Sequence, residues 1–375
     1  MSKSRKTSGA CKLRLRDLGI EIGTLETGRF NAITDVEGVR VGQVTIKAGK
    51  GALVPGKGPV RTGVTAIIPH GGDLFHDRVC AASFVLNGNG EVTGLSWVKE
   101  SGCLEGPVLL TNTLNVHNVA NGAITWMLDR YPGIGITEDT YLPVVGECDD
   151  SALNDTRGRH VKPRHAHQAL CKATSGPVQE GAVGAGTGMT CYRFKGGIGT
   201  SSRVLPKDGG GYTVGVLVNA NHGARHQLRI DGVPVGRNIE DLKPTAWKDG
   251  SICIVVATDA PLGPLELERL ARRAALGLAR TGATAQNGSG DFVLAFSTSR
   301  RLPRGSSSVV LNLSQVNGEY IDPLFEATAD ATEEAIINCL FAAETTVGRD
   351  DHVTHALPID RVAAILRFHG RNVEF

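Results

Sequence analysis

Residues 249–256 read Asp-Gly-Ser-Ile-Cys-Ile-Val-Val, a turn dipeptide followed directly by an apolar run. Asp-Gly is a frequent turn signal, and a short apolar run bounded by turn residues is typical of a buried strand. We therefore predict a buried strand over residues 252–257, which begins almost immediately after Gly250. It is one of several such runs, and they alternate with helical segments along the chain.

Strands are also predicted over residues 39–46, 63–68, 80–86, 107–111, 212–218 and 308–313. Apolar residues at helical spacing predict helices over residues 116–128, 265–280, 331–346 and 361–368, with Asp330 as the N-cap of the third. The polar stretch 155–179 is expected to form an exposed loop or lid. Strands interleaved with helices indicate a layered α/β fold. Because no repeat or linker divides the chain, we expect one domain over residues 1–375.

The composition excludes several classes of function. Lys and Arg number 40 and Asp and Glu 38, so the net charge of +2 gives no reason to expect a nucleic-acid partner. No apolar run approaches the ~20 residues of a membrane span, and the basic N-terminus lacks the apolar segment of a signal peptide. The eight cysteines include no C-x-x-C pair and are interpreted as reduced thiols. We therefore expect a cytoplasmic protein that binds neither nucleic acid nor membrane.

A serine that opens a buried strand directly after a glycine is the arrangement that a self-processing hydrolase needs. Glycine tolerates a strained backbone and leaves room for the Ser251 hydroxyl to attack the carbonyl carbon of Gly250. This N→O acyl shift forms an ester, whose hydrolysis frees a new N-terminus. The α-amine of Ser251, whose pKa is far lower than that of lysine, can then act as a general base. Composition alone favours a simpler interpretation, a turn followed by an ordinary strand, because Gly-Ser before a strand is commonplace.

Three other polar clusters are candidates for site residues, and each also has a structural interpretation. Asn219 ends a predicted strand, where its amide could stabilise an oxyanion, and an asparagine-rich turn explains it equally well. Glu147 is the first of three carboxylates after an apolar stretch, so it could hold an ammonium group or belong to a solvated loop. Ser289 and Asp291 lie in Asn-Gly-Ser-Gly-Asp before an apolar run, for which a hairpin turn is the commoner explanation.

Two further patterns argue against a cofactor. Residues 184–188 read Gly-Ala-Gly-Thr-Gly, which matches neither the G-x-G-x-x-G fingerprint nor a P-loop. The histidines at positions 160, 165, 167, 352 and 355 lack the H-E-x-x-H spacing of zinc peptidases. We expect no nucleotide and no metal, and we assign these histidines to the surface.

Seven blocks of the chain point together to one family. They are residues 31–42, 87–95 with 110–114, 143–147 with 153–155, 184–188, 218–221, 250–251 and 288–291. In this order they resemble the DmpA-type aminopeptidase family, which includes L-aminopeptidase/D-Ala-esterase-amidases and β-aminopeptidases. A single block is a weak signal, whereas all of them in order are specific. The resemblance extends over most of the chain.

The resemblance implies an α/β fold of the αββα sandwich type, shared with ornithine acetyltransferases. It also implies self-processing of the single domain into an α-chain of residues 1–250 and a β-chain of residues 251–375. No metal and no cofactor are implied. A homo-oligomer, a tetramer of αβ units, is the assembly that the family implies.

Catalytic roles are also implied residue by residue. Ser251 matches the nucleophile, and Ser289 matches a second hydroxyl that assists proton transfer. Asp291 falls where the family has an acidic residue that orients this hydroxyl, and Asn219 matches the oxyanion donor. A backbone N–H near Ser289 or Gly290 is implied to assist Asn219.

Substrate binding is implied for Glu147, which matches the carboxylate that holds the substrate ammonium. One departure affects the pocket, because Cys-Asp-Asp-Ser follows at residues 148–151 where many relatives have Thr, Trp or Tyr and then Asp-Gly. The implied substrates are small peptides and amino-acid amides or esters.

The expected function is a self-cleaving serine aminopeptidase that releases small N-terminal residues, of the Gly or Ala type, through an acyl-enzyme on Ser251. L-residues in peptides and D-Ala amides or esters are implied by the family. One alternative is an acyltransferase of the ornithine acetyltransferase type, although that group is usually cut before threonine. The other is a non-catalytic ligand-binding α/β domain that keeps the fold without cleavage.

Overall fold

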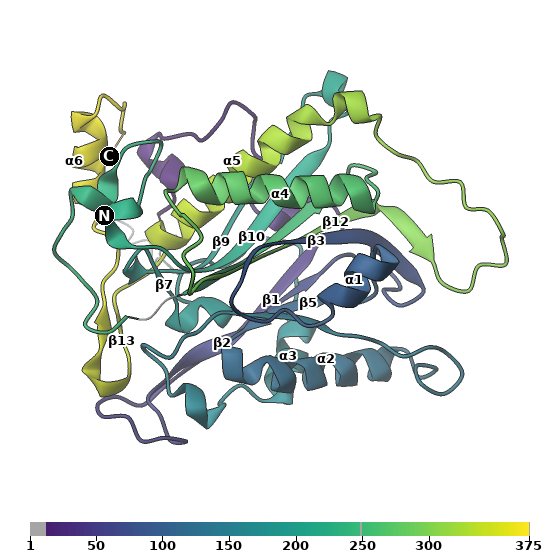
Figure 1. Cartoon of the computed structure of the whole chain (residues 1–375), viewed down its shortest axis with the longest axis horizontal. Coiled ribbons are helices and arrows are strands. Elements are labelled where there is room, and N and C mark those ends of the chain that lie inside the picture. Colours follow the sequence, from purple (N-terminus) through teal and green to yellow (C-terminus); the bar gives the residue numbers. More distant parts are fainter. Residues whose placement is uncertain (1–12, 248–249, 375) are drawn as a thin grey trace, which may run out of the picture.

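The computed structural model describes residues 13–247 and 250–374, so Asp249 of the predicted turn lies outside the described residues. Two β-sheets are stacked face to face, and a pair of helices covers the outer face of each (Figure 1). The predicted αββα sandwich is therefore confirmed. None of the helices in the described ranges is long and apolar enough to cross a bilayer.

The larger sheet contains the strand predicted after Gly250. In spatial order its strands are β4 (Cys103–Leu104), β3 (Asp77–Gly88), β12 (Gly290–Pro303), β11 (Ser251–Thr258), β10 (Thr213–Asn221) and β9 (Gly197–Val204). Strands β11 and β12 run parallel, and the other neighbours run antiparallel. Strand β11 is hydrogen-bonded on both sides, and all 8 of its residues are buried.

The smaller sheet comprises β1 (Arg40–Ala48), β2 (Val60–Ile68), β5 (Val108–Thr111) and β6 (Val144–Glu147) in that order. Strands β5 and β6 run parallel, whereas β1, β2 and β5 pair antiparallel. Two short ladders lie outside the sheets and are formed by β7 (Thr190–Cys191) with β8 (Phe194–Lys195) and by β13 (Thr346–Val347) with β14 (Val353–Thr354).

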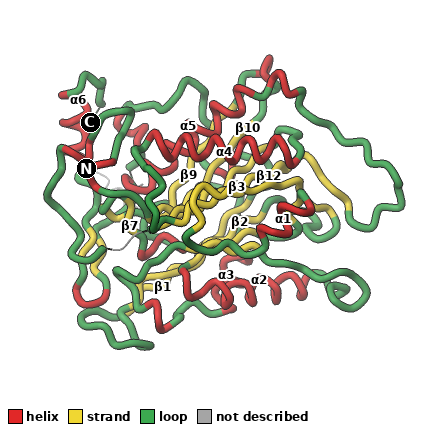
Figure 2. Tube along the Cα trace, viewed as in Figure 1, coloured by secondary structure: helices red, strands yellow, loops and turns green. Residues whose placement is uncertain are grey.

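The outer layers are helical. Helices α4 (Pro264–Arg280) and α5 (Asp322–Phe341) cover the larger sheet, and α2 (Val116–Arg130) and α3 (Pro163–Cys171) cover the smaller one (Figure 2). Helix α4 packs on β3 and β12 and buries one apolar stripe. Helix α5 is buried over most of its circumference because it packs on β9 and β10 and also, along its side, against α4. Helices α1 (Leu95–Ser101) and α6 (Ile359–Phe368) lie at the periphery.

Alternation along β11 divides its side chains between two cores. Ile252 and Ile254 pack in the core below α4 and α5, whereas Cys253 and Val255 pack in the core between the two sheets. Because successive side chains of a strand point to opposite faces, alternation places Ser251 on the face of Cys253. The first side chain of β11 is thereby directed toward the layer between the sheets.

Three sequence predictions are wrong. Residues 308–313 form no strand, because β12 ends at Pro303 and no strand pairs with this run, in which Val309 is 100% exposed. Asp330 is not an N-cap, since α5 begins at Asp322 with a proline in its first turn and Asp330 forms an ion pair with Arg280 inside the helical layer. Residues 155–179 are not an exposed loop, because they include α3, whose apolar side chains pack on the smaller sheet.

Candidate active site

Ser251 lies at the start of the central strand of the larger sheet. It is the register partner of Asn221 on β10, and its side chain is only 5% exposed. The backbone N–H of Gly290, the first residue of β12, donates a hydrogen bond of 3.1 Å to Ser251 Oγ. The adjacent strand therefore holds the hydroxyl oxygen of Ser251 in place.

Gly250 occupies a position that no other residue can fill without a shift of the backbone. A Cβ atom built on Gly250 would lie 1.5 Å from the carbonyl oxygen of Asn221. Strand β10 therefore passes directly against the residue that precedes Ser251. The glycine that the sequence places here is required by this close approach.

Ser289 and Asp291 form a hydrogen-bonded pair next to Gly250. Ser289 Oγ donates a hydrogen bond of 2.7 Å to Asp291 Oδ1, and both side chains are buried. Together with His222, these two residues and Gly250 line one small cavity. Burial raises the pKa of Asp291 to about 6, while the hydrogen bond from Ser289 acts in the opposite direction. At neutral pH the Asp291 carboxylate is therefore ionised and accepts the hydrogen bond of Ser289.

Asn219 lies on β10, on the side of β11 opposite to β12 and its Asp291. It is the register partner of Cys253, so its side chain shares the face of Cys253 and Ser251. The side chain is fully buried, and neither Oδ1 nor Nδ2 has a hydrogen-bond partner in the described part of the chain. A buried amide without partners costs free energy and requires an explanation. A bound substrate would supply the missing acceptor.

Glu147 reaches the same region from the smaller sheet, at the end of β6. Its carboxylate accepts hydrogen bonds from the Thr113 hydroxyl and from the backbone N–H of Glu91, the latter at 3.1 Å. Burial raises the pKa of Glu147, and the nearby Asp149 carboxylate raises it further, whereas both hydrogen bonds lower it. A buried carboxylate with a raised pKa gains by pairing with a cation, such as the ammonium group of a substrate.

Two thiols connect the sheets at this point. Cys253 Sγ on β11 lies 3.4 Å from the carbonyl oxygen of Glu147, and Cys148 Sγ lies 3.5 Å from the carbonyl oxygen of Asn219. The end of β6 is therefore held against β10 and β11. This contact brings Glu147 to the face of the larger sheet that carries Asn219 and Ser251.

The structure thus brings the candidate residues into one region, in separate groups. Ser251 contacts Gly290, and Ser289 contacts Asp291, but no hydrogen bond within the described ranges joins Ser251 to Ser289, Asn219 or Glu147. Among described residues, no three His, Cys, Asp or Glu side chains are grouped as metal ligands.

Three residues of this region received no individual role from the sequence. Thr113 holds the Glu147 carboxylate, but nothing in its local sequence reveals this partner. Asn221 follows Asn219 by two residues, and this spacing indicates that both side chains lie on the same face of the strand. His222 is buried with Nε2 unpartnered in the described ranges, and burial lowers its pKa to about 3, so its ring is neutral.

Comparison with known proteins agrees with this arrangement. Residues 31–354 match the sequence model of Peptidase family S58. The chain is 44% identical over 374 residues to Beta-peptidyl aminopeptidase BapA of Sphingosinicella microcystinivorans, and the match covers 96% of this chain and 93% of that protein.

Solved structures are equally similar. The PH0078 protein from Pyrococcus horikoshii OT3 superposes with a TM-score of 0.92 and 48% identity, over 96% of this chain and 100% of that one. The L-aminopeptidase D-Ala-esterase/amidase from Ochrobactrum anthropi, a prototype of the serine aminopeptidases with a variant of the Ntn hydrolase fold, gives 0.89 and 44%, over 96% and 99%. This chain therefore belongs to peptidase family S58, and it is a serine-type aminopeptidase with the N-terminal-nucleophile hydrolase fold.

Proposed function

We propose that the protein cuts itself between Gly250 and Ser251 and then uses Ser251 to release N-terminal residues from short peptides and amino-acid amides or esters. The observation that carries this proposal is the position of Ser251. Ser251 is the first residue of the central strand, and its buried hydroxyl oxygen accepts a hydrogen bond from the Gly290 N–H. Its side chain shares a strand face with Asn219, whose amide has no hydrogen-bond partner in the described residues. In this proposal the single domain of residues 1–375 becomes two chains, 1–250 and 251–375.

Self-cleavage requires only groups that lie beside the bond. Ser251 Oγ attacks the carbonyl carbon of Gly250, and its proton passes to the nitrogen of Ser251 as the C–N bond breaks. The product is an ester between Gly250 and Ser251 Oγ. Water hydrolyses this ester, which leaves Gly250 with a carboxylate and Ser251 with a free amine.

The mature site then repeats the same attack on a substrate. Ser251 Oγ attacks the carbonyl that follows the first residue, and the α-amine of Ser251, or Ser289 paired with Asp291, accepts the proton. The amide of Asn219 and the N–H of Gly290 donate hydrogen bonds to the oxyanion. The leaving amine takes the proton, and water resolves the acyl-enzyme.

Glu147 restricts the reaction to the N-terminus of the substrate, because its buried carboxylate pairs with a free ammonium group. Relatives carry the names β-peptidyl aminopeptidase and L-aminopeptidase D-Ala-esterase/amidase. We therefore propose small first residues of the Gly or Ala type, including D-Ala amides and esters, with β-amino acids as further candidates. A tetramer of αβ units, a cytoplasmic location and the absence of a cofactor stay predictions.

Intact mass and N-terminal sequencing of the purified protein test the proposal. We expect two fragments of about two-thirds and one-third of the chain, the smaller beginning Ser-Ile-Cys-Ile-Val, and hydrolysis of alanine p-nitroanilide. A single intact chain without turnover would contradict the proposal and favour a ligand-binding domain. Two fragments that transfer acetyl groups from acetylornithine without hydrolysis would instead indicate an acyltransferase.

The pKa of Asp291 leads to a prediction about pH. Because this pKa lies at about 6, Asp291 is ionised above that pH and orients the Ser289 hydroxyl as its hydrogen-bond acceptor, and it is neutral below. We expect kcat to fall as the pH drops through about 6, and Asp291→Asn to lower kcat and remove this inflection. Rates from about pH 5 to pH 8 in both proteins provide the measurement. An inflection that persists in Asp291→Asn would have to be assigned to another group, such as Glu147.

A further inference from the structure

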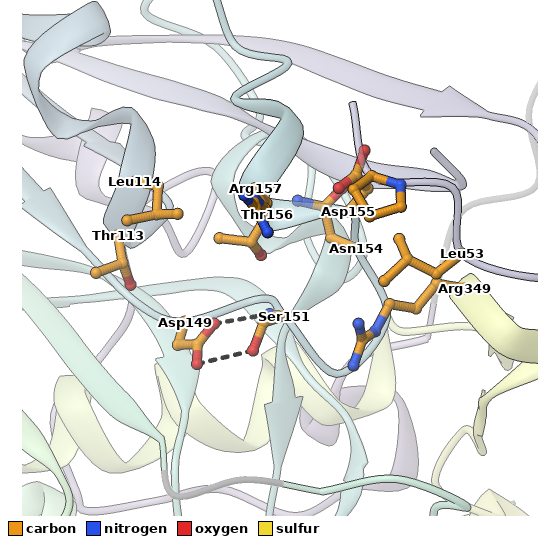
Figure 3. Close-up of a pocket in the computed structure, with 11 residues that line it drawn as sticks. Leu53, Thr113, Leu114, Asp149, Ser151, Asn154, Asp155, Thr156, Arg157 and Arg349 are labelled. Atoms are coloured by element: carbon orange, nitrogen blue, oxygen red, sulfur yellow. Dashed lines mark hydrogen bonds between the residues drawn. The ribbon is translucent and has the colours of Figure 1, made fainter. Parts of the chain in front are cut away.

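A cavity of about 450 Å³ opens beside the proposed ammonium site, and the mechanism above makes no use of it. Figure 3 shows the residues that line this cavity. Its wall is formed by Leu53 and Pro55, by Thr113 and Leu114, by a loop within residues 149–157 and by Arg349. The volume lies in the range of small-molecule pockets, about 300–1,000 Å³. The cavity is large enough to hold part of a short peptide.

The cavity adjoins both halves of the candidate site. Thr113 contributes to its wall, and the hydroxyl of Thr113 donates to the Glu147 carboxylate. Asp149 also contributes, and its carbonyl oxygen accepts a hydrogen bond of 2.9 Å from Asn221 Nδ2, where Asn221 is the register partner of Ser251. A substrate held at Glu147 and Ser251 therefore has this cavity next to it.

The acidic side chains of the cavity already have partners. Asp149 accepts hydrogen bonds from the backbone N–H and the hydroxyl of Ser151, at 2.8 and 2.9 Å. Asp155 pairs with His160 at 2.9 Å and accepts a 2.7 Å hydrogen bond from the N–H of Gly56. Among the described residues, neither carboxylate forms an ion pair with an arginine of the cavity.

The two arginines of the cavity lack comparable partners. Within the described residues the Arg157 guanidinium forms no hydrogen bond or ion pair, and Arg349 Nε is buried without a hydrogen-bond partner. The ion pair of Arg349 is with its neighbour Asp350, at 3.9 Å, which is beyond hydrogen-bond distance. Arg349 therefore has an unsatisfied donor at the cavity, and the exposed Arg157 adds a second positive charge to its wall.

We propose that this cavity binds a carboxylate of the substrate through Arg349, with Arg157 as a second positive charge in its wall. The inference rests on the proposed aminopeptidase function and names its substrate class, short peptides that carry a carboxylate close to the cleaved bond. Guanidinium groups bind carboxylates through paired, charge-assisted hydrogen bonds, which matches the unused donors here. The carboxylate comes either from the C-terminus of a dipeptide or from an acidic first side chain, and the substrates below separate these sources.

The test compares substrates with and without the carboxylate. Wild-type enzyme should cleave Ala-Gly with a lower KM than its C-terminal amide, Ala-Gly-NH2. Arg349→Gln should raise KM for Ala-Gly at least about 10-fold and leave the amide and alanine p-nitroanilide unchanged. Arg349→Lys should restore part of the loss. If the side chain is the source, Arg349→Gln should instead abolish a preference for aspartyl over asparaginyl p-nitroanilide.

Arg159→Gln is the matched control, because this substitution removes the same charge as Arg349→Gln. Arg159 is exposed, lies two residues after Arg157 and does not line the cavity. It should leave all substrates unchanged. The inference is overturned if wild-type enzyme hydrolyses alanine p-nitroanilide but shows neither carboxylate preference, or if Arg349→Gln affects acid and amide equally. A wild-type protein without any turnover of alanine p-nitroanilide would instead refute the proposed function itself.

Discussion

Replacing Ser251 with alanine should leave the protein as one chain of 375 residues that does not hydrolyse alanine p-nitroanilide. The proposed mechanism uses this hydroxyl twice, first against the Gly250 carbonyl and then against the substrate. Loss of the nucleophile in a serine hydrolase lowers kcat by roughly 10⁶-fold. Denaturing electrophoresis and intact mass report the processing, and turnover reports the second step.

Two further variants separate the hydroxyl from general damage to the fold. Ser306→Ala changes an exposed serine in the loop after β12, and it should be processed and active like the wild type. Ser251→Cys keeps a nucleophilic atom in place and should retain some processing. If the Ser251→Ala protein were still divided into two active chains, another residue would have to be the nucleophile.

Asn219→Ala should lower kcat by about 10²–10³ with little change in KM, as loss of one oxyanion donor does. Self-cleavage forms an oxyanion at the same place, so uncut chain should accumulate and kcat has to be expressed per processed chain. The melting temperature should change little, because neither polar atom of this amide has a hydrogen-bond partner in the described residues. Calorimetry and steady-state kinetics on the same preparation provide both readouts.

Asn221→Ala is the comparison variant for a purely structural role, because Asn221 lies on the same strand face as Asn219. Asn221 Nδ2 donates to the Asp149 carbonyl at 2.9 Å, and Asn221 Oδ1 accepts from the Thr190 N–H at 2.7 Å. Removing it leaves a buried N–H without its partner, which costs about 1–3 kcal/mol of stability. If Asn219→Ala destabilised the protein to the same extent and kept its kcat, its role would be structural.

The parts of the fold that could be predicted from the sequence are those with a strong local signal. The apolar run after Ser251 and the amphipathic pattern of α4 define elements regardless of their partners, and both are present. Residues 308–313 show the limit of this reasoning, because an apolar run predicts a strand only where another strand is available to pair with it. Asp330 shows a similar limit, since a capping pattern carries no information on the helical turns that precede it.

The site was less predictable because it joins two sheets. From the residues alone, Glu147 was as consistent with a solvated loop as with a binding site. What decides its environment is the stacking of β6 against β10 and β11 and the hydroxyl of Thr113, on a segment far from it in sequence. No local pattern encodes that contact, so the proposed role of Glu147 rests on the family resemblance together with the buried environment seen in the structure.

The location of the proposed cut, at the very beginning of β11, has a consequence for how the enzyme persists. The new chain end would remain in a sheet whose neighbours on the two sides, β10 and β12, belong to different fragments, and α5 would still pack on β9 and β10. Before the cut, folding is an event within one molecule; afterwards, two denatured pieces would first have to meet. Maturation would thus make unfolding effectively irreversible, and the lifetime of the folded enzyme would depend on its unfolding rate rather than on an equilibrium free energy.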